Sequence, residues 1–449
     1  MVESRTPGYD QLGTPWLPML HILLLPFVRV DAWWHSGIAA AFPSAACFVI
    51  GGTFLFLAVR RIFGSTAAAV TATALAALNP NLLYLQSTSM TEAMFFGAFM
   101  AIFYFTVRGS AVGAGVAALA ASLTRFDGWI LIPFVALFFL RRGLKPALVF
   151  SILAAAGPLY WMSHNWYLTG DALDFYRGPG SPTAIQGDAF YPGKENWRWA
   201  FLYFRTAVSL VAGPGLAIAG AVGVIAAGAR RTWWPLALLT LPPLFYVWSV
   251  HSSGLPIFVP QFWPYGHYNT RYGLSALPLL AFGGASLAAM APRRFQARAA
   301  AAVIFAAIVP WLLHPAPEAW ITWAESRRNS EQRRAWTQEA AEFLSSRYVR
   351  GSGIITSFGD LTGIFRRMRI PLAETFTVCD GLPWDAAVRR PDLFLTEEWA
   401  VAIRGDQVDR AIAIAAKQGV RYRLEKTIVK KNEPVIEIYH REGGLHGPP

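Results

Sequence analysis

Residues 36–59 read SGIAAAFPSAACFVIGGTFLFLAV, and the pair Arg60-Arg61 follows directly. This stretch of 24 residues holds no Asp, Glu, Lys, Arg or His. About 20 consecutive apolar residues are enough for a helix to cross the hydrocarbon core of a bilayer. The stretch therefore predicts a membrane-spanning helix that ends at a pair of cations.

Nine further apolar stretches follow it, and the composition agrees, with 54% hydrophobic and 15% charged residues. We therefore expect a polytopic α-helical membrane protein of about ten spans. The stretches 111–126 and 128–140 are short, and together they predict a hairpin that dips into the membrane or just crosses it. The nine stretches are 65–84, 90–107, 111–126, 128–140, 146–164, 208–228, 232–250, 272–291 and 299–314.

The charges between the spans predict their orientation. Residues 1–315 hold 19 Lys and Arg but only 9 Asp and Glu, so the net charge of +12 comes mainly from this part. Alternating spans place eleven of the cations, and none of the acids, on one side, which indicates the cytoplasmic face. This bias predicts an inner-membrane protein and no nucleic-acid partner. The eleven are Arg60, Arg61, Arg108, Arg141, Arg142, Lys145, Arg230, Arg231, Arg293, Arg294 and Arg298.

The two ends of the chain differ from the membrane part. The apolar segment Trp16–Val30 is too short and proline-rich for a span, and it predicts an interfacial helix on the outer leaflet. Beyond Ala316, alternating polar helices and short strands predict a small extracytoplasmic α/β domain. We expect three parts: 1–35 as an outer loop, 36–315 as the bundle, and 316–449 as the soluble domain. The elements expected in the soluble domain are helices 326–347 and 407–419 and strands 353–357, 393–396, 422–429 and 434–440.

Ionisable groups at membrane depth are expensive, so those at the outer ends of spans are candidates for function. Glu92 follows the break Asn79-Pro80-Asn81 and opens a span. It could face a cavity, or it could be a helix N-terminal carboxylate with Thr88 or Ser89 as the cap.

Arg125 and Asp127 lie at the tip of the short hairpin, in Thr-Arg-Phe-Asp-Gly-Trp. In one interpretation the two charges neutralise each other. In the other, Arg125 offers a bidentate grip to a phosphate or carboxylate.

Two outer segments complete the candidates. The loop 164–198 is too long for a plain connector and carries Arg177 and Lys194 among aromatic residues, which suit sugar stacking as well as a membrane-interface belt. The segment 263–272 carries His267, Arg271 and Tyr272. Arg271 could snorkel to the interface or could bind a lipid phosphate.

Soluble-enzyme motifs and metal sites are absent from the sequence. It has no phosphate-binding Walker loop, no serine-nucleophile elbow and no HExxH. Its two cysteines, Cys47 and Cys379, predict neither a disulfide nor a metal site. The outward-facing acids leave a need for Mg²⁺ or Mn²⁺ open, although no residue spacing predicts a metal site.

In the order of these features the chain resembles the polytopic glycosyltransferases with the C-type fold. It is most similar to bacterial relatives of the protein O-mannosyltransferases and of the lipid A aminoarabinose transferase. The resemblance covers about residues 12–315. The segments that carry it are Pro15-Trp16-Leu17-Pro18, Arg60 to Gly64, Leu78-Asn79-Pro80 with Met90-Thr91-Glu92, Leu123 to Trp129, Asn165 to Phe175, and Asn269 to Tyr272.

The resemblance implies a polyprenyl-phosphate sugar donor, an inverting transfer on the outer face, and a lipid, glycan or protein acceptor. The leaving phosphate then needs cations, here Arg125, Arg177, Lys194 or Arg271, with His267 and Tyr272 beside them. The acceptor hydroxyl needs a carboxylate base. The candidates for that base are Asp10, Glu92 and Asp127.

The resemblance also implies a first span and an acidic outer loop ahead of Pro15. Only fourteen residues precede Pro15, and Asp10 is the nearby acid. We therefore expect a span and the principal acid to be missing from this sequence. The alternative function is a non-catalytic polytopic protein, either a transporter or a degenerate transferase homologue.

Overall fold

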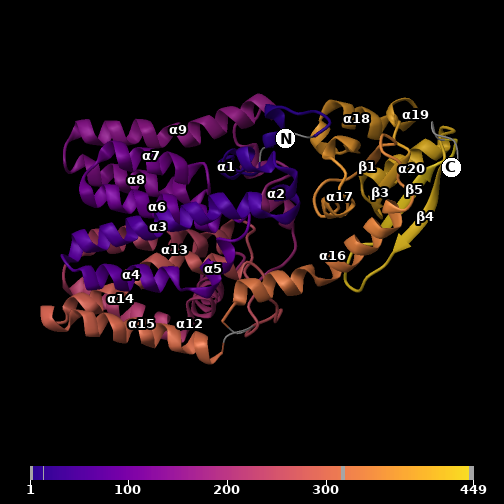
Figure 1. Cartoon of the computed structure of the whole chain (residues 1–449). Helices are drawn as coiled ribbons and strands as arrows, with labels where there is room; N and C mark the ends of the chain where they lie inside the picture. The colour runs from indigo at the N-terminus through magenta and orange to yellow at the C-terminus, as the bar shows by residue number, and fades with distance from the viewer. Residues whose placement is uncertain (1–3, 14, 315–318, 444–449) are drawn as a thin grey trace. The chain divides into compact units, whose positions relative to one another are not determined.

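The computed structural model describes residues 4–13, 15–314 and 319–443. Within them the chain forms two compact units: residues 15–326 form one, and residues 4–13 with 327–443 form the other. The first is a helical bundle and the second is a small α/β unit (Figure 1). The predicted fold class, a polytopic helical membrane protein with a C-terminal α/β domain, is confirmed.

Each of the ten predicted spans has a helical counterpart in the bundle unit. Six of the helices among the described residues are long and apolar enough to cross a membrane. In chain order the unit contains α1 (Met19–Val28), α2 (Asp31–Ser36), α3 (Ile38–Phe63), α4 (Thr66–Ala77), α5 (Pro80–Leu85), α6 (Glu92–Arg108), α7 (Ala111–Ser122), α8 (Asp127–Leu140), α9 (Leu144–Thr169), α10 (Asp174–Arg177), α11 (Pro182–Gln186), α12 (Trp197–Ala229), α13 (Trp233–Ser252), the 3₁₀ helix η2 (Thr270–Ala276), α14 (Leu277–Met290), the 3₁₀ helix η3 (Arg293–Phe295), α15 (Gln296–Leu313) and the first residues of α16 (Ile321–Ser345).

Two of the turns between helices follow the same local rule. After α3 and after α6 the chain turns at a glycine with positive φ, Gly64 at 62° and Gly109 at 82°. Each is followed by a serine, Ser65 or Ser110, whose side chain accepts a backbone N–H of the next helix. A left-handed glycine ends a helix and a serine cap starts one, so these Gly-Ser pairs fix both turns.

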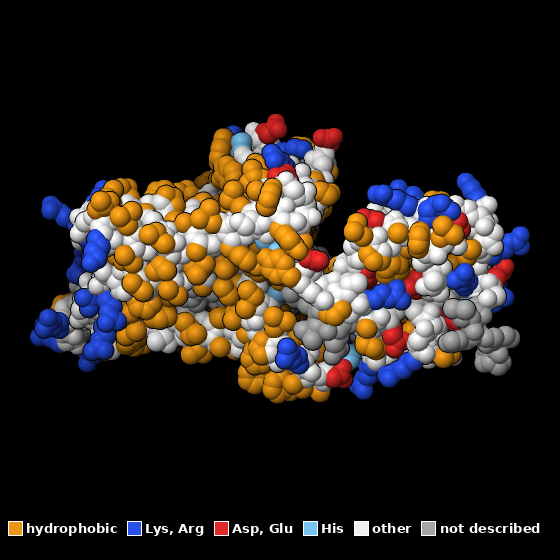
Figure 2. All heavy atoms as spheres, turned by 90° about the horizontal axis from the view of Figure 1, so that it is seen from above, with side chains coloured by type: hydrophobic (Ala, Val, Ile, Leu, Met, Phe, Trp, Pro, Cys, Tyr) orange, Lys and Arg blue, Asp and Glu red, His pale blue; other side chains and the backbone are white. Residues whose placement is uncertain are grey.

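The eleven cations predicted to be cytoplasmic lie at one end of the bundle, where Figure 2 shows a group of Lys and Arg side chains on the face in view. They lie in or just after the last turns of α3, α6, α8, α12 and α14, or in or just before the first turns of α9 and α15. Helix α6 has 17 residues between Glu92 and Arg108, so its two ends lie about 25 Å apart. Glu92 therefore lies at the end opposite the cations.

Small residues allow the central helices α12 and α14 to approach closely. A Cβ added at Gly223 would lie 1.9 Å from the backbone oxygen of Gly283. Close backbone approach through small residues is the usual packing of membrane helices.

Helix α12 is kinked at Gly213-Pro214, where Gly213 has φ 73°. The kink leaves the Val211 carbonyl free for side chains, and it accepts from Asn79 Nδ2 at 2.8 Å and from Asn81 Nδ2 at 3.0 Å. The Asn79-Pro80-Asn81 break is therefore a structural joint, with Asn79 as the cap of α5.

Of two further predicted segments, one forms a short helix as expected and the other has different bounds. The Trp16–Val30 segment forms α1, a ten-residue helix with no buried side chain, which is too short for a span. The outer loop predicted from residue 164 starts later, because α9 continues to Thr169 and encloses His164 and Asn165. Its far end is also shorter than expected, since α12 begins at Trp197.

The C-terminal unit is a five-stranded sheet with strand order β2-β1-β3-β5-β4. Strand β1 pairs in parallel with β2 and β3, and β5 pairs antiparallel with β3 and β4. Helices α16 and α17 share an apolar core with β1, β3, β4 and β5. The elements after α16 are β1 (Ile354–Thr356), α17 (Thr362–Met368), η4 (Leu372–Glu374), β2 (Thr375–Phe376), η5 (Val378–Asp380), α18 (Leu382–Arg389), α19 (Pro391–Phe394), β3 (Trp399–Ile403), α20 (Gln407–Lys417), β4 (Tyr422–Ile428) and β5 (Ile436–Arg441).

The strand predicted at 393–396 is wrong. Pro391 starts the short helix α19 there, as proline does at a first helical position. The strand lies further on, at Trp399–Ile403, where four consecutive residues are buried. A strand buried on both faces shows a continuous apolar run rather than alternation.

The N-terminal segment belongs to the C-terminal unit rather than to an outer loop of the bundle. Arg5 Nη1 lies 2.5 Å from the buried carboxylate of Glu397, and Thr6 Oγ1 donates to Asp380 at 2.9 Å. Asp10 is exposed and lies in the 3₁₀ helix η1 (Tyr9–Leu12) of the same segment. The boundary predicted between residues 315 and 316 lies outside the described residues.

Candidate functional site

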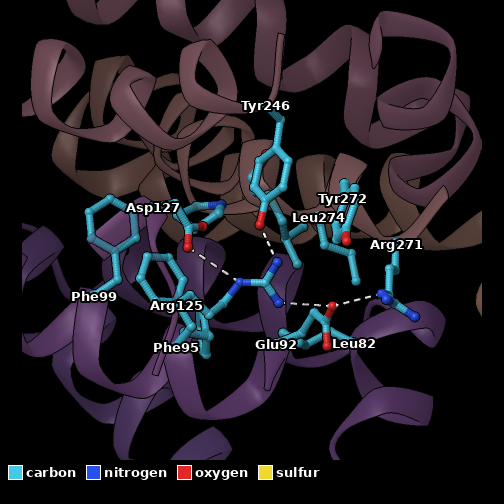
Figure 3. Close-up of a pocket in the computed structure, with 14 residues that line it drawn as sticks. Leu82, Glu92, Phe95, Phe99, Arg125, Asp127, Tyr246, Arg271, Tyr272 and Leu274 are labelled. Carbon is cyan, nitrogen blue, oxygen red and sulfur yellow. Dashed lines mark hydrogen bonds and ion pairs between the residues drawn. The ribbon is translucent and has the colours of Figure 1, made fainter. Parts of the chain in front are cut away.

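A pocket of about 450 Å³, counting the space at its open mouth, lies where several segments of the bundle meet. Glu92 comes from the first turn of α6, and Arg125 and Asp127 come from the junction of α7 and α8. Arg271 and Tyr272 come from η2. Figure 3 shows these side chains converging from segments that are far apart in the sequence.

Arg125 is at the centre of the charged group and is almost fully engaged. Its Nη1 lies 3.0 Å from Glu92 Oε1 and donates to Thr91 Oγ1 at 2.8 Å. Its Nε donates to Asp127 Oδ1 at 3.3 Å, and its Nη2 donates to the Tyr246 hydroxyl (Figure 3). Since a guanidinium has five N–H donors, little of its capacity is left for a ligand.

Glu92 joins the two arginines. Its Oε1 lies 3.1 Å from Arg271 Nε, on the side away from Arg125. Its other oxygen, Oε2, is buried and has no hydrogen-bond partner among the residues that the structure describes. A buried carboxylate oxygen without a donor is costly in a finished structure, and such atoms often mark a place that a ligand completes.

Exposure separates the two arginines. The side chains of Asp127 and Glu92 are 2% and 9% exposed, that of Arg125 is 13%, and that of Arg271 is 27%. In Figure 3 the end of the Arg271 guanidinium points away from the cluster. Arg271 is therefore the cation of this group that can reach an incoming anion.

The rings of two tyrosines pack against the two arginines of the charged group. The Tyr246 and Tyr272 rings stack with centroids 4.6 Å apart, and the Arg125 guanidinium carbon lies 5.7 Å from each. The Arg271 guanidinium carbon lies 5.3 Å from the Tyr272 ring. These cation–π contacts compensate part of the cost of burying the arginines.

Apart from Ser275, the rest of the lining is apolar, and it comes mainly from one face of α6 and from the end of η2 and the start of α14. The pocket thus joins a charged wall to an apolar wall. The apolar residues are Leu82, Phe95, Phe96, Phe99, Leu274, Leu277 and Pro278.

Five of the nine predicted site residues line this pocket, and the other four do not. Arg177 pairs with Asp171 at 2.6 Å, and this ion pair holds the pKa of the Asp171 carboxyl below its usual value. Lys194 donates to the Gly187 carbonyl at 3.2 Å. His267 lies half-buried in the segment before η2, and Asp10 lies in the other unit.

The geometry bears on two alternatives that the sequence leaves open, for Glu92 and for Arg125 with Asp127. Thr91 is the N-cap of α6 and makes no side-chain cap, while Thr88 accepts only from the backbone of Met90 at 3.3 Å. The predicted side-chain cap is therefore absent, but Glu92 does lie in the first turn of α6, and it also lines the pocket, so both interpretations describe its position. Arg125 and Asp127 form an ion pair and neutralise each other, as in the first of their two interpretations.

Sequence reasoning missed Tyr246 and Thr91. Tyr246 lies within the apolar helix α13, 121 residues from Arg125. A tyrosine among membrane aromatics gives no signal of a buried polar partner. Thr91 directly precedes the predicted Glu92, and its hydroxyl could have been considered as a partner for Arg125.

Among the described residues no group of three or more His, Cys, Asp or Glu is placed to hold a metal ion. The four charged side chains of the pocket instead balance one another, two positive against two negative.

Neither any family model nor any curated protein matches the sequence. Two solved structures match the fold across nearly the whole chain. ArnT from Cupriavidus metallidurans in the apo state has 12% sequence identity and a TM-score of 0.55, with 95% of this chain and 88% of that chain covered. The same protein bound to undecaprenyl phosphate has 14% identity and a TM-score of 0.57, with 97% and 90% covered. The chain therefore shares the C-type glycosyltransferase fold of this lipid A aminoarabinose transferase, as its resemblance predicted.

Proposed function

We propose that this multi-pass membrane protein is an inverting glycosyltransferase whose donor is a sugar linked to a polyprenyl phosphate. The observation that carries the proposal is the two-sided pocket, with the partly exposed Arg271 beside a wall of phenylalanines. A polyprenyl phosphate has the complementary halves, an anionic head and an apolar chain. ArnT, whose fold this chain shares, has been solved with undecaprenyl phosphate bound.

Arg271 binds the donor phosphate in this proposal. The phosphate is the leaving group, and a guanidinium matches two of its oxygens. Arg125 already contacts Glu92, Asp127 and Tyr246, so its role is to fix the positions of these three side chains in the pocket wall. Asp127 then serves to fix Arg125.

The acceptor hydroxyl needs a base, and we assign this role to Glu92. Within the described part of the chain its Oε2 has no hydrogen-bond partner, and it belongs to a residue that lines the pocket. In the transfer, the acceptor oxygen bonds to the anomeric carbon and the bond from that carbon to the phosphate oxygen breaks. The phosphate keeps the electron pair, and the acceptor proton passes to the carboxylate.

The membrane arrangement supports transfer at the outer face of the inner membrane. The cations gather at one end of the bundle, and the pocket lies at the other ends of the same helices. By the positive-inside rule, the cationic end is cytoplasmic. The acceptor is a lipid, glycan or protein, and roles for Asp10, Arg177, Lys194, His267 and a divalent cation stay predictions. The shared transferase fold favours an enzyme over the transporter alternative.

Release of the lipid product tests this without knowledge of the acceptor. The purified full chain in liposomes is given a panel of undecaprenyl-phosphate sugars and a membrane extract as acceptor source, and free undecaprenyl phosphate is measured. We expect the wild type to release undecaprenyl phosphate. Glu92→Gln and Arg271→Ala should each reduce this release by about 100-fold or more. Arg293→Ala removes a cation at the other end and should keep full activity. Equal release by all four proteins would overturn the assignment.

A further inference from the structure

Glu325 lies in the second turn of α16 and is buried against the segment that carries Arg271. Its Oε1 accepts the backbone N–H of Asn269 at 2.8 Å, and its Oε2 accepts the backbone N–H of Thr270 at 3.0 Å. The Thr270 hydroxyl donates to the same Oε2. All of these groups belong to the bundle unit.

These bonds cap the start of a long helical segment. Residues 270–290 form a continuous helical run of η2 and α14, whose first N–H groups would otherwise lack partners. A carboxylate at this end satisfies two of them and opposes the positive end of the helix dipole. The cap is supplied in space by a residue 55 positions away in the sequence.

The turn that Glu325 holds is otherwise unfavourable. Asn269 has φ 55°, in the left-handed region that few non-glycine residues occupy. Its side chain donates to the Pro256 carbonyl at 3.0 Å, and Phe258 and Tyr268 exchange backbone hydrogen bonds at 3.0 and 3.1 Å. Glu325 thus completes a clasp that ends one residue before Arg271.

Glu325 is itself held in place through the preceding turn of its helix. Thr322, three positions earlier, donates its backbone N–H to Asn81 Oδ1 at 2.9 Å. Asn81 Nδ2 donates in turn to the Ala319 carbonyl at 3.1 Å. The start of α16 is therefore fixed to the wall of the bundle, and Glu325 with it.

We propose that Glu325 is a positioning residue for donor binding: it holds the Asn269–Thr270 turn so that Arg271 points to the donor phosphate. The inference rests on the function proposed above. Glu325 does not line the pocket and acts only through Arg271. Removing the charge of Glu325 leaves the apolar wall of the pocket intact. The protein should therefore lose affinity for the phosphate head and keep its affinity for the lipid chain.

The test compares two lipids and one local structural readout on the full chain in nanodiscs. Binding of undecaprenyl phosphate and of undecaprenol is measured for the wild type and Glu325→Gln, together with hydrogen exchange of the peptide covering residues 269–276. We expect Glu325→Gln to weaken binding of undecaprenyl phosphate about tenfold and to leave binding of undecaprenol unchanged. Hydrogen exchange in the peptide 269–276 should become faster. Glu331→Gln, an exposed glutamate of the same helix, should match the wild type.

A second pair of variants keeps the test open if Glu325→Gln does not fold. Thr270→Val removes one hydroxyl donor at nearly constant volume and should act in the same direction, whereas Thr270→Ser keeps the hydroxyl and should restore binding. Equal weakening of both lipids, or unchanged exchange in 269–276, would overturn the positioning role. If the wild type binds no undecaprenyl phosphate, the proposed function fails, while the exchange data still decide whether Glu325 holds the turn.

Discussion

Replacing Arg125 with methionine should lower the free energy of unfolding of the bundle strongly, while the apolar wall of the pocket stays in place. The substitution keeps a side chain of similar length but removes contacts to Glu92, Thr91, Asp127 and Tyr246. Asp127 is 2% exposed and loses its cation, while Glu92 keeps only Arg271. Breaking a buried ion pair from one side costs about 3–5 kcal/mol, because the remaining charge is uncompensated.

The double variant Arg125→Met with Asp127→Leu separates the loss of the pair from the loss of packing. Removing both partners of a buried pair is often close to neutral, so we expect the double variant to regain about 2 kcal/mol of the loss. Arg108→Met, an exposed arginine at the other end of α6, is the matched control and should change stability by less than about 0.5 kcal/mol.

Equilibrium unfolding in mixed micelles, followed by tryptophan fluorescence, measures these differences. We expect wild type and Arg108→Met to be the most stable, the double variant to be less stable, and Arg125→Met to be the least stable. If Arg125→Met is as stable as Arg108→Met, Arg125 is not the clamp of this pocket. A double variant less stable than Arg125→Met would equally refute the uncompensated-charge argument.

Three further substitutions test other parts of the account. Tyr246→Phe keeps the stacked ring but removes the hydroxyl that accepts from Arg125, and should lower the free energy of unfolding by about 1–3 kcal/mol in the same assay. Gly223→Val should cost at least about 1–3 kcal/mol through overpacking, since an added Cβ would lie 1.9 Å from a backbone oxygen of α14; a folded variant of wild-type stability would contradict this helix contact. Arg5→Ala leaves the buried Glu397 without its cation and should speed proteolysis of the C-terminal unit, which limited trypsin digestion measures against Arg423→Ala, an exposed ion-pair control.

The spans and their charge pattern could be predicted because both are local in the sequence. Apolar runs, cations at one set of ends, and Gly-Ser turns such as Gly64-Ser65 each act within a few residues. The strand of the α/β unit at Trp399–Ile403 was missed because a fully buried strand lacks alternation, and Pro391 starts a helix just before it. The place of residues 4–13 in the C-terminal unit depends on pairs such as Arg5 with Glu397, which no local pattern indicates.

The site divides in the same way. Glu92, Arg125 and Arg271 could be identified because a charge at the end of a span is conspicuous in an apolar sequence. Tyr246 and Glu325 could not, since their partners are 121 and 55 residues away. Arg177 and Lys194 carry charges of the same kind, but they make local contacts within their own loop.

The most direct measurement is the affinity of the full chain in nanodiscs for undecaprenyl phosphate and for undecaprenol, with and without the Arg271→Ala substitution. The two lipids differ only in the phosphate, so their difference in affinity isolates recognition of the head. We predict that the wild type prefers the phosphate form and that Arg271→Ala binds both lipids equally. Equal affinities in the wild type, or an undiminished preference in Arg271→Ala, would contradict the proposal that this pocket receives a lipid phosphate.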